Sequence, residues 1–213
     1  MKFNDLIVII GKQPFFDLAT VVQLSGDKKE TVKAQLYRWA KAGKIVSLRR
    51  GMYAFADVYS QRPLNLAELA NQLYRPSYLS LEWALSFYGL IPEKVVTFTS
   101  VTTRVPRRFN SAVGEFRYIN IKRSFFFGYK PMEIRGRKVL LAVPEKALLD
   151  LWHLQKGEWS DVRMTEMRFQ NIELVNPDKL EEFADKLNRP RLYRAIVQWR
   201  RLQEEYGAGT VVI

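Results

Sequence analysis

Hydrophobic and polar positions between residues 28 and 42 follow the period of a helix. The apolar residues fall at i, i+4, i+7 and i+8, so they share one face. These residues are Val32, Leu36, Trp39 and Ala40. Asp27 is the expected N-cap, with Glu30 placed as in a capping box, and Gly43 suits the turn just past the helix end. The pattern therefore predicts one amphipathic helix with two defined ends.

Two short runs of β-forming residues follow this helix, at 45–48 and 52–55. They flank an Arg-Arg-Gly turn and predict a hairpin. Upstream, apolar patterns predict helices over 3–10 and 18–24, and Ser25-Gly26 makes a tight turn. Helix, helix, turn, helix and hairpin is the order of a winged helix-turn-helix domain. We expect this domain to occupy residues 1–60.

A winged helix-turn-helix domain places the helix after the turn in the major groove and the hairpin on the DNA backbone or minor groove. Such contacts need cations near phosphates, and amide or guanidinium groups at base edges. The residues expected to bind DNA are Lys28, Lys29, Thr31, Lys33, Gln35, Arg38, Lys41, Arg49 and Arg50. The alternatives are a solvated helix face without a ligand and a winged domain that binds protein.

Residues 61–213 are expected to form an α+β domain. The pattern predicts helices over 64–74, 77–90, 144–154, 161–169, 177–187 and 191–206. It predicts strands over 95–101, 115–122 and 138–143. The aromatic run at 125–129 is either a strand or a loop. The expected fold class is α+β, with an N-terminal winged helix-turn-helix, a small sheet of three to five strands flanked by helices, and a helical C-terminus.

Charge narrows the choice of partner. The chain has 34 Lys and Arg against 22 Asp and Glu, a net charge of +12. Residues 1–62 carry 11 basic and 5 acidic side chains, or +6, and residues 104–138 carry 10 and 2, or +8. A strongly basic balance favours a polyanionic partner such as nucleic acid.

The second basic segment also contains many aromatic residues. We interpret it as a second basic surface, formed by Arg104, Arg107, Arg108, Arg117, Lys122, Arg123, Arg135, Arg137 and Lys138. The interleaved aromatic residues are Phe109, Phe116, Tyr118, Phe125, Phe126, Phe127 and Tyr129. Cations with aromatic rings suit nucleic acid, which offers phosphates and stackable bases. The alternative is a sheet whose aromatic rings form the core while its arginines face water.

Little in the sequence favours an enzyme. The chain has no cysteine and a single histidine, His153, for which packing or surface exposure is expected. We interpret Glu145 and Asp150 as residues that place charge at the end and on the surface of the 144–154 helix. We expect no catalytic residue, metal or cofactor. No run is long enough to span a bilayer and no signal peptide is recognisable, so a cytoplasmic protein without membrane contact is expected.

Four segments carry a resemblance to a known family. They read GKIVSLRRGMYAF, YLSLEWALSFYGLIPE, RVPRRF with GEFRYINI, and AVPEKALLDLWHL. In these segments and their spacing the chain resembles the AbiEi-type transcriptional regulator antitoxins of type IV toxin–antitoxin systems. The resemblance covers about residues 1–155, so the role of residues 156–213 stays open.

The resemblance implies two activities. The N-terminal domain would bind inverted repeats in double-stranded DNA of its own promoter and repress the operon. The C-terminal domain would oppose a co-encoded nucleotidyltransferase-like toxin without forming a stable complex. Two alternatives remain: an enzyme acting on nucleic acid that a winged module targets, and a ligand-sensing regulator without a toxin.

Overall fold

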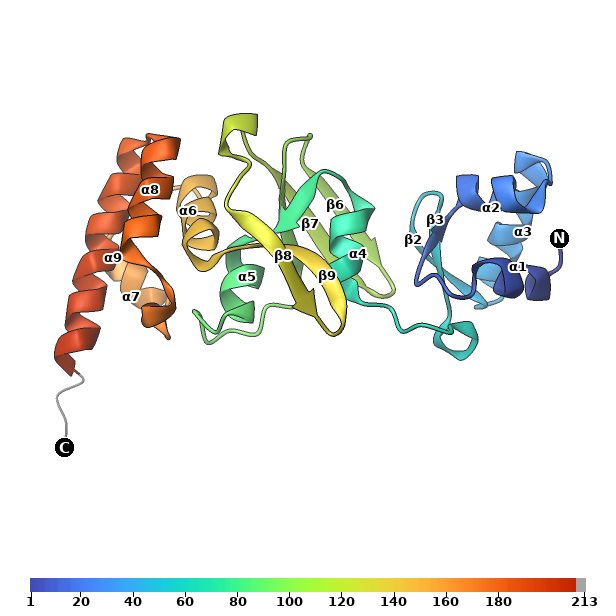
Figure 1. Ribbon diagram of the computed structural model, residues 1–213, viewed down its shortest axis with the longest axis horizontal. Helices are drawn as coiled ribbons and strands as arrows, with labels where there is room; N and C mark the ends of the chain where they lie inside the picture. Colours follow the sequence, from blue (N-terminus) through green and yellow to red (C-terminus); the bar gives the residue numbers. More distant parts are fainter. Residues whose placement is uncertain (210–213) are drawn as a thin grey trace.

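The computed structural model describes residues 1–209, and the side chains of residues 1–206. The described chain is elongated (Figure 1). An N-terminal unit lies at one end, a six-stranded sheet lies in the middle, and a group of helices lies at the other end. The fold is therefore of the mixed α and β kind, with two separate sheets.

The N-terminal unit contains three helices and a small sheet. Its elements are α1 (Phe3–Ile10), β1 (Phe16–Asp17), α2 (Leu18–Ser25), α3 (Lys29–Lys41), β2 (Ile45–Arg49) and β3 (Met52–Phe55). The expected helices and hairpin are all present. The strand β1 was not predicted, and it pairs with β3 so that the order in the sheet is β1-β3-β2. Two residues are too few to show an alternating pattern.

The start of α3 differs from the expectation. Lys28 is the N-cap residue and makes no side-chain cap, so the predicted capping box of Asp27 and Glu30 is wrong. The Asp27 carboxylate instead accepts a hydrogen bond of 2.8 Å from the N-terminal ammonium of Met1. A charged partner competes well with a backbone amide for a carboxylate. At the other end Gly43 has a φ of +68°, as expected past a helix end.

The rest of the chain builds the larger sheet and its covering helices. After η1 (Asp57–Tyr59), these elements are α4 (Leu66–Leu73), β4 (Ser77–Leu79), α5 (Leu81–Phe87), β5 (Phe98–Thr102), β6 (Arg107–Ser111), β7 (Gly114–Asn120), η2 (Arg123–Phe125), β8 (Tyr129–Ile134) and β9 (Arg137–Ala142). The strand order is β6-β7-β5-β4-β9-β8. The pairs β5–β7 and β4–β9 are parallel and the others are antiparallel. This sheet has one strand more than the expected maximum of five.

The expected helix over 77–90 is wrong in its first part, which is the central strand β4. Tyr78 and Leu79 are both fully buried, so both faces of the strand are covered. A strand buried on both faces has no apolar–polar alternation and resembles a buried helix in sequence. The strand leads into α5 at Leu81, whose φ is +58°. The aromatic run at 125–129 is mostly loop, since β8 begins only at Tyr129.

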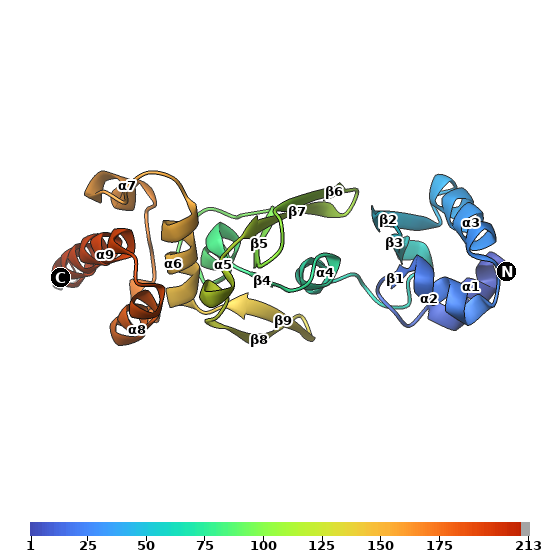
Figure 2. The ribbon, with the colours of Figure 1, turned by 90° about the horizontal axis from the view of Figure 1, so that it is seen from above.

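The sheet curls around α4. In Figure 2, α4 lies between the arm formed by β6 and β7 and the arm formed by β8 and β9. The side chain of Asn71 on α4 accepts a hydrogen bond of 2.5 Å from the backbone N–H of Leu140 and donates one of 3.2 Å to its carbonyl. The Tyr118 hydroxyl donates to the carbonyl of Ala70 at 2.5 Å. These bonds connect α4 to both arms.

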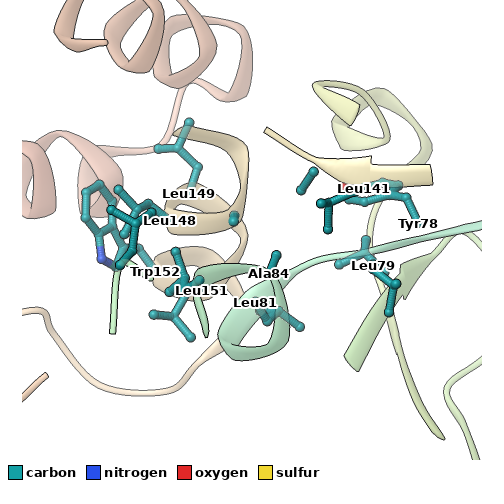
Figure 3. Close-up of a cluster of buried hydrophobic side chains, with 14 of the residues drawn as sticks. Tyr78, Leu79, Leu81, Ala84, Leu141, Leu148, Leu149, Leu151 and Trp152 are labelled. Carbon is teal, nitrogen blue, oxygen red and sulfur yellow. The ribbon is translucent and has the colours of Figure 1, made fainter. Parts of the chain in front are cut away.

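Helices after the sheet complete the described chain. They are α6 (Pro144–Leu154), α7 (Asp161–Glu166), η3 (Ile172–Leu174), α8 (Pro177–Leu187) and α9 (Pro190–Gly209). α6 contacts α5 and β9 on one side and α8 and α9 on the other. Figure 3 shows its residues Leu148, Leu151 and Trp152 in the cluster of buried side chains beside α5. Every residue of α6 from Glu145 to Trp152 is buried.

The hairpin of the N-terminal unit belongs to two cores. Ile45 and Phe55 pack with the helices of the N-terminal unit. Leu48 and Met52 lie in the same buried cluster as the residues of the larger sheet. Strands β2 and β6 are in contact across the boundary. The two units therefore share a packed interface through the hairpin.

Candidate nucleic-acid interface

The outward face of α3 carries most of the residues expected to bind DNA. Val32 and Leu36 are fully buried beneath it, which fixes the helix orientation. The exposed residues at and along the helix are Lys28, Lys29, Glu30, Thr31, Lys33, Ala34, Tyr37, Arg38 and Lys41. Gln35 is half-buried on the flank of this face. The structure thus brings seven of the nine predicted residues onto or beside one helix face.

The cations of this face form no ion pair with any side chain that the structure describes. Within the described part of the chain, no ion pair involves Lys28, Lys29, Lys33, Arg38 or Lys41. Glu30 is the single acidic residue of α3. Uncompensated charge on a rigid helix attracts polyanions over the range of a Debye length. The face therefore has the electrostatic character that phosphate contacts need.

The arginines of the hairpin tip lie elsewhere. Arg49 is half-buried and Arg50 is exposed. Both line a cleft between the hairpin and the larger sheet, where the chain between α4 and β4 passes close by. The structure therefore places them beside the second unit instead of on the face of α3. Arg49 also borders a neighbouring hollow that includes Lys29, at the start of α3.

This cleft gathers arginines from three segments. It has a volume of about 480 Å³ and is lined by Arg49, Arg50, Gln72, Leu73, Tyr74, Arg75, Arg104, Arg107 and Phe109. The guanidinium of Arg104 lies over the Tyr74 ring at 4.4 Å, and that of Arg107 at 5.8 Å. None of the described residues that line the cleft carries a carboxylate. We name this feature the arginine cleft.

The residues of the predicted second basic surface do not form one surface. Arg104 and Arg107 line the arginine cleft. Arg108 pairs with Glu115 at 2.5 Å on the β6–β7 arm, where Arg117 is its cross-strand neighbour. Lys122 and Arg123 are exposed before and in η2, and Arg135, Arg137 and Lys138 lie at the β8–β9 turn. The two arms lie on opposite sides of α4 (Figure 2), so the cations are divided among separate places.

The aromatic residues of this segment belong to the core. Phe116, Tyr118 and Phe125 are buried, and the other four are half-buried and packed against the same cluster. Burial raises the pKa of the Tyr118 hydroxyl, and the nearby charge of Arg49 opposes this. The three buried rings cannot stack on a nucleic-acid base, and the four half-buried rings are partly covered by the core. The structure therefore supports the alternative in which aromatic residues build the sheet's core and arginines face water.

A buried polar network on α6 was missed by sequence reasoning. Lys146 and Asp150 form an ion pair, and both side chains are fully buried. The Asp150 carboxylate also accepts hydrogen bonds from the hydroxyls of Tyr78 at 2.9 Å and Ser80 at 2.7 Å. Lys146 donates to the Tyr78 oxygen at 3.0 Å. Burial, and then the charge of Asp150, raise the pKa of Tyr78 well above its ordinary value.

Glu145 and Asp150 are therefore not surface residues, contrary to the expectation. α6 is covered on all sides, so charged positions as well as apolar ones are enclosed. Glu145 accepts a hydrogen bond of 3.1 Å from the backbone N–H of Asn176 and pairs with Lys179 at 3.2 Å. The pKa of Tyr88 is raised to about 12, by burial and by the charge of Glu145. The clue in the sequence was a Lys and an Asp four residues apart within an apolar run.

His153 packs, as expected for a lone histidine. It is half-buried, and its ring meets the ring of Phe125 edge-on at 5.2 Å. Burial lowers its pKa, Asp150 opposes this, and Arg189, Lys146 and Arg191 lower it further. In the described chain, no three or more acidic or histidine side chains gather closely enough to share a metal ion.

Two further findings concern the chain as a whole. Between residues 1 and 209, none of the helices combines the length and apolar composition that crossing a membrane requires. No protein-family model matches the chain, and no curated protein sequence matches it significantly.

Proposed function

We propose that residues 1–60 form a winged helix-turn-helix that binds double-stranded DNA through α3. One observation carries the proposal. The exposed face of α3 presents cations with no ion-pair partner among the described residues, and its apolar face is locked into the core by Val32 and Leu36. A rigid helix with such a face has the dimensions and charge that fit the major groove.

The roles of individual residues follow from their chemistry. Lys28, Lys29, Lys33 and Lys41 would neutralise phosphates, which supplies affinity on any sequence. Arg38 and Gln35 carry the groups that pair with guanine and adenine edges. The Oε1 of Gln35 is buried and has no hydrogen-bond partner within the described protein, so its amide would have to turn outward to contact a base.

We further propose that the protein is an autorepressor and antitoxin of the kind that its sequence resembles. In this proposal the N-terminal unit reads inverted repeats in its own promoter. Residues 61–213 oppose a nucleotidyltransferase-like toxin from the same operon without a stable complex. The support is the resemblance of residues 1–155, together with the separation of the α3 face from the helices at the far end of the molecule (Figure 1).

Fluorescence anisotropy with the full chain tests the DNA-binding proposal. The probes are a labelled duplex spanning the DNA upstream of the gene and a scrambled duplex of the same composition. The double variant Lys33→Gln, Arg38→Gln should weaken binding at least tenfold and reduce the salt dependence, because phosphate contacts release counterions. The matched control Lys122→Gln, Arg123→Gln removes the same charge from exposed positions far along the chain. Equal affinities of the two variants would contradict the role of α3.

Co-expression with the neighbouring open reading frame tests the antitoxin proposal. If that frame encodes a nucleotidyltransferase-like toxin, growth arrest should be relieved by the full chain. Relief should persist in the Lys33→Gln, Arg38→Gln variant, because that variant loses repression only. Growth arrest that the full chain leaves unchanged would contradict the antitoxin role.

A further inference from the structure

We propose that the arginine cleft is a phosphate-binding site that holds closely spaced phosphate groups between the two units. The phosphates belong either to a free nucleoside polyphosphate or to a nucleic-acid backbone. The proposal uses no residue of the α3 face, so it stands or fails independently of DNA reading by α3.

Charge is the first argument. Five guanidinium groups line one cleft, and no carboxylate lines it. None of Arg49, Arg50, Arg75, Arg104 and Arg107 forms an ion pair within the described residues, whereas Arg62, Arg108 and Arg137 all do. Like charges that converge without counter-charges repel one another in the free protein. A bound polyanion would remove that repulsion.

Unused hydrogen-bond donors are the second argument. The Nε of Arg49 is buried and has no acceptor within the described protein. Its Nη1 reaches only the Arg50 carbonyl, at 3.5 Å. The side chains of Arg50, Arg75 and Arg107 are exposed and make no hydrogen bond to another described residue, so their guanidinium donors are free to bind a ligand from solvent. A buried donor is normally satisfied, so the Nε of Arg49 marks a place where an acceptor-rich ligand fits, and the exposed guanidinium groups of Arg50, Arg75 and Arg107 would exchange water for the same ligand.

The chemistry of the ligand follows from these donors. Guanidinium forks match the paired oxygens of phosphate, and phosphates carry more charge per group than carboxylates. A volume of about 480 Å³ lies within the range of small-molecule sites. The Tyr74 ring is already covered by Arg104, so the cleft offers charge and leaves that ring unavailable for base stacking. Closely spaced phosphates are therefore the feature recognised.

The position of the cleft gives the site a structural consequence. Arg49 and Arg50 come from the hairpin of the N-terminal unit, and Arg75 and Arg107 come from the larger sheet and its approach. A ligand that binds arginines from both units adds a direct connection between them. Binding should therefore raise the thermal stability of the whole chain.

Calorimetric titration of the full chain tests the site. The probes are inorganic triphosphate and ATP, each without divalent metal, and the duplex of the previous section is titrated in parallel by anisotropy. The test variant is Arg75→Gln, Arg107→Gln, which leaves α3 and the hairpin intact. The matched control is Arg117→Gln, Arg123→Gln, which removes two exposed arginines outside the cleft. Thermal melts confirm that each variant folds.

Three outcomes decide the question. In the first outcome, triphosphate binds at least tenfold more weakly to the cleft variant and unchanged to the control. This result supports the site, with a free polyphosphate as its ligand. In the second outcome triphosphate does not bind, and only the cleft variant loses duplex affinity tenfold. Its salt slope should then fall by about 0.9 per lost phosphate contact, and this result assigns the site to the nucleic-acid backbone. Equal behaviour of the cleft variant and control in both titrations overturns the proposal. The Lys33→Gln, Arg38→Gln variant should keep triphosphate binding, which separates this test from that of α3.

Discussion

Lys146 and Asp150 face each other one helical turn apart on α6, and neither side chain reaches solvent. Removing a charge from water is costly, and this cost is recovered only when the pair is well bonded. Here Tyr78 and Ser80 supply the additional hydrogen bonds. The network connects the central strand β4 to α6, so it joins the sheet to the helical end of the molecule.

Substitution of Asp150 by Asn should be strongly destabilising. It leaves the Lys146 ammonium buried without a counter-charge, which costs about 3–5 kcal/mol in comparable buried pairs. Urea unfolding followed by circular dichroism measures the loss. The control is Glu182→Gln, which breaks the exposed Lys186–Glu182 pair at the same i,i+4 spacing and should change little. Similar midpoints for both variants would show that the buried pair contributes little.

His153 should make stability fall between neutral and mildly acidic pH. Its pKa in the folded protein is below the ordinary value of 6.5, because burial disfavours the imidazolium. The unfolded chain therefore binds a proton first as the pH falls, and this favours unfolding. The loss should begin near pH 6.5 and end below the lowered pKa.

Thermal melts of the parent and of His153→Gln between pH 7.5 and 5 measure this effect. The variant should lose less stability over that interval than the parent. The exposed carboxylates Glu93 and Glu158 have lowered pKa values, so their contribution is lost only at more acid pH. Parallel pH profiles for the two proteins would contradict the assignment to His153.

Gly128→Ala should cost more stability than the same change at Gly136. Both glycines have positive φ, +74° and +71°, so both substitutions carry the same backbone strain. A Cβ at Gly128 would lie 2.9 Å from Lys146 Cγ and from Phe183, whereas nothing lies within 4 Å of one at Gly136. We expect an extra loss of about 1–3 kcal/mol from overpacking, measured by urea unfolding. Equal losses would indicate that α6 and α8 move apart freely.

Asn71→Ala should weaken the attachment of β9 to α4. The amide of Asn71 bonds to both backbone groups of Leu140, and alanine removes both bonds. The expected loss is about 1–3 kcal/mol. Hydrogen exchange should show faster exchange of the Leu140 amide while the amides of α3 keep their rates. Unchanged exchange at Leu140 would mean that solvent already reaches this bond.

Sequence reasoning succeeded where one face of an element meets water. α3 and α8 are amphipathic, and their apolar spacing predicted them closely. It failed at β4, because Tyr78 and Leu79 are covered on both sides. The edge strands β6 and β8 were missed because β6 carries two arginines, two polar residues and a single half-buried ring, and β8 holds a proline. One-sided burial was therefore the clearest signal, although α6, which is covered on all sides, was also predicted over 144–154, with a proline at its first position.

The same limit applies to the candidate sites. The exposed cations of α3 could be predicted because neighbouring turns of one helix share a face. The arginine cleft could not, since Arg49, Arg75 and Arg107 are far apart in sequence and only the packing of the hairpin on the sheet brings them together. The buried position of Lys146 likewise depends on α5, α8 and α9 enclosing α6.

The hairpin has one more consequence, for how the chain can be divided. Leu48 and Met52 belong by sequence to residues 1–60, but their side chains are buried against the larger sheet. A fragment cut at residue 60 would present these side chains to water and lose part of what holds its own hairpin. The boundary expected from the sequence near residue 60 therefore does not coincide with the boundary between the two buried cores. Heating should reveal a single transition that includes α3, with no separate early melting of the N-terminal end.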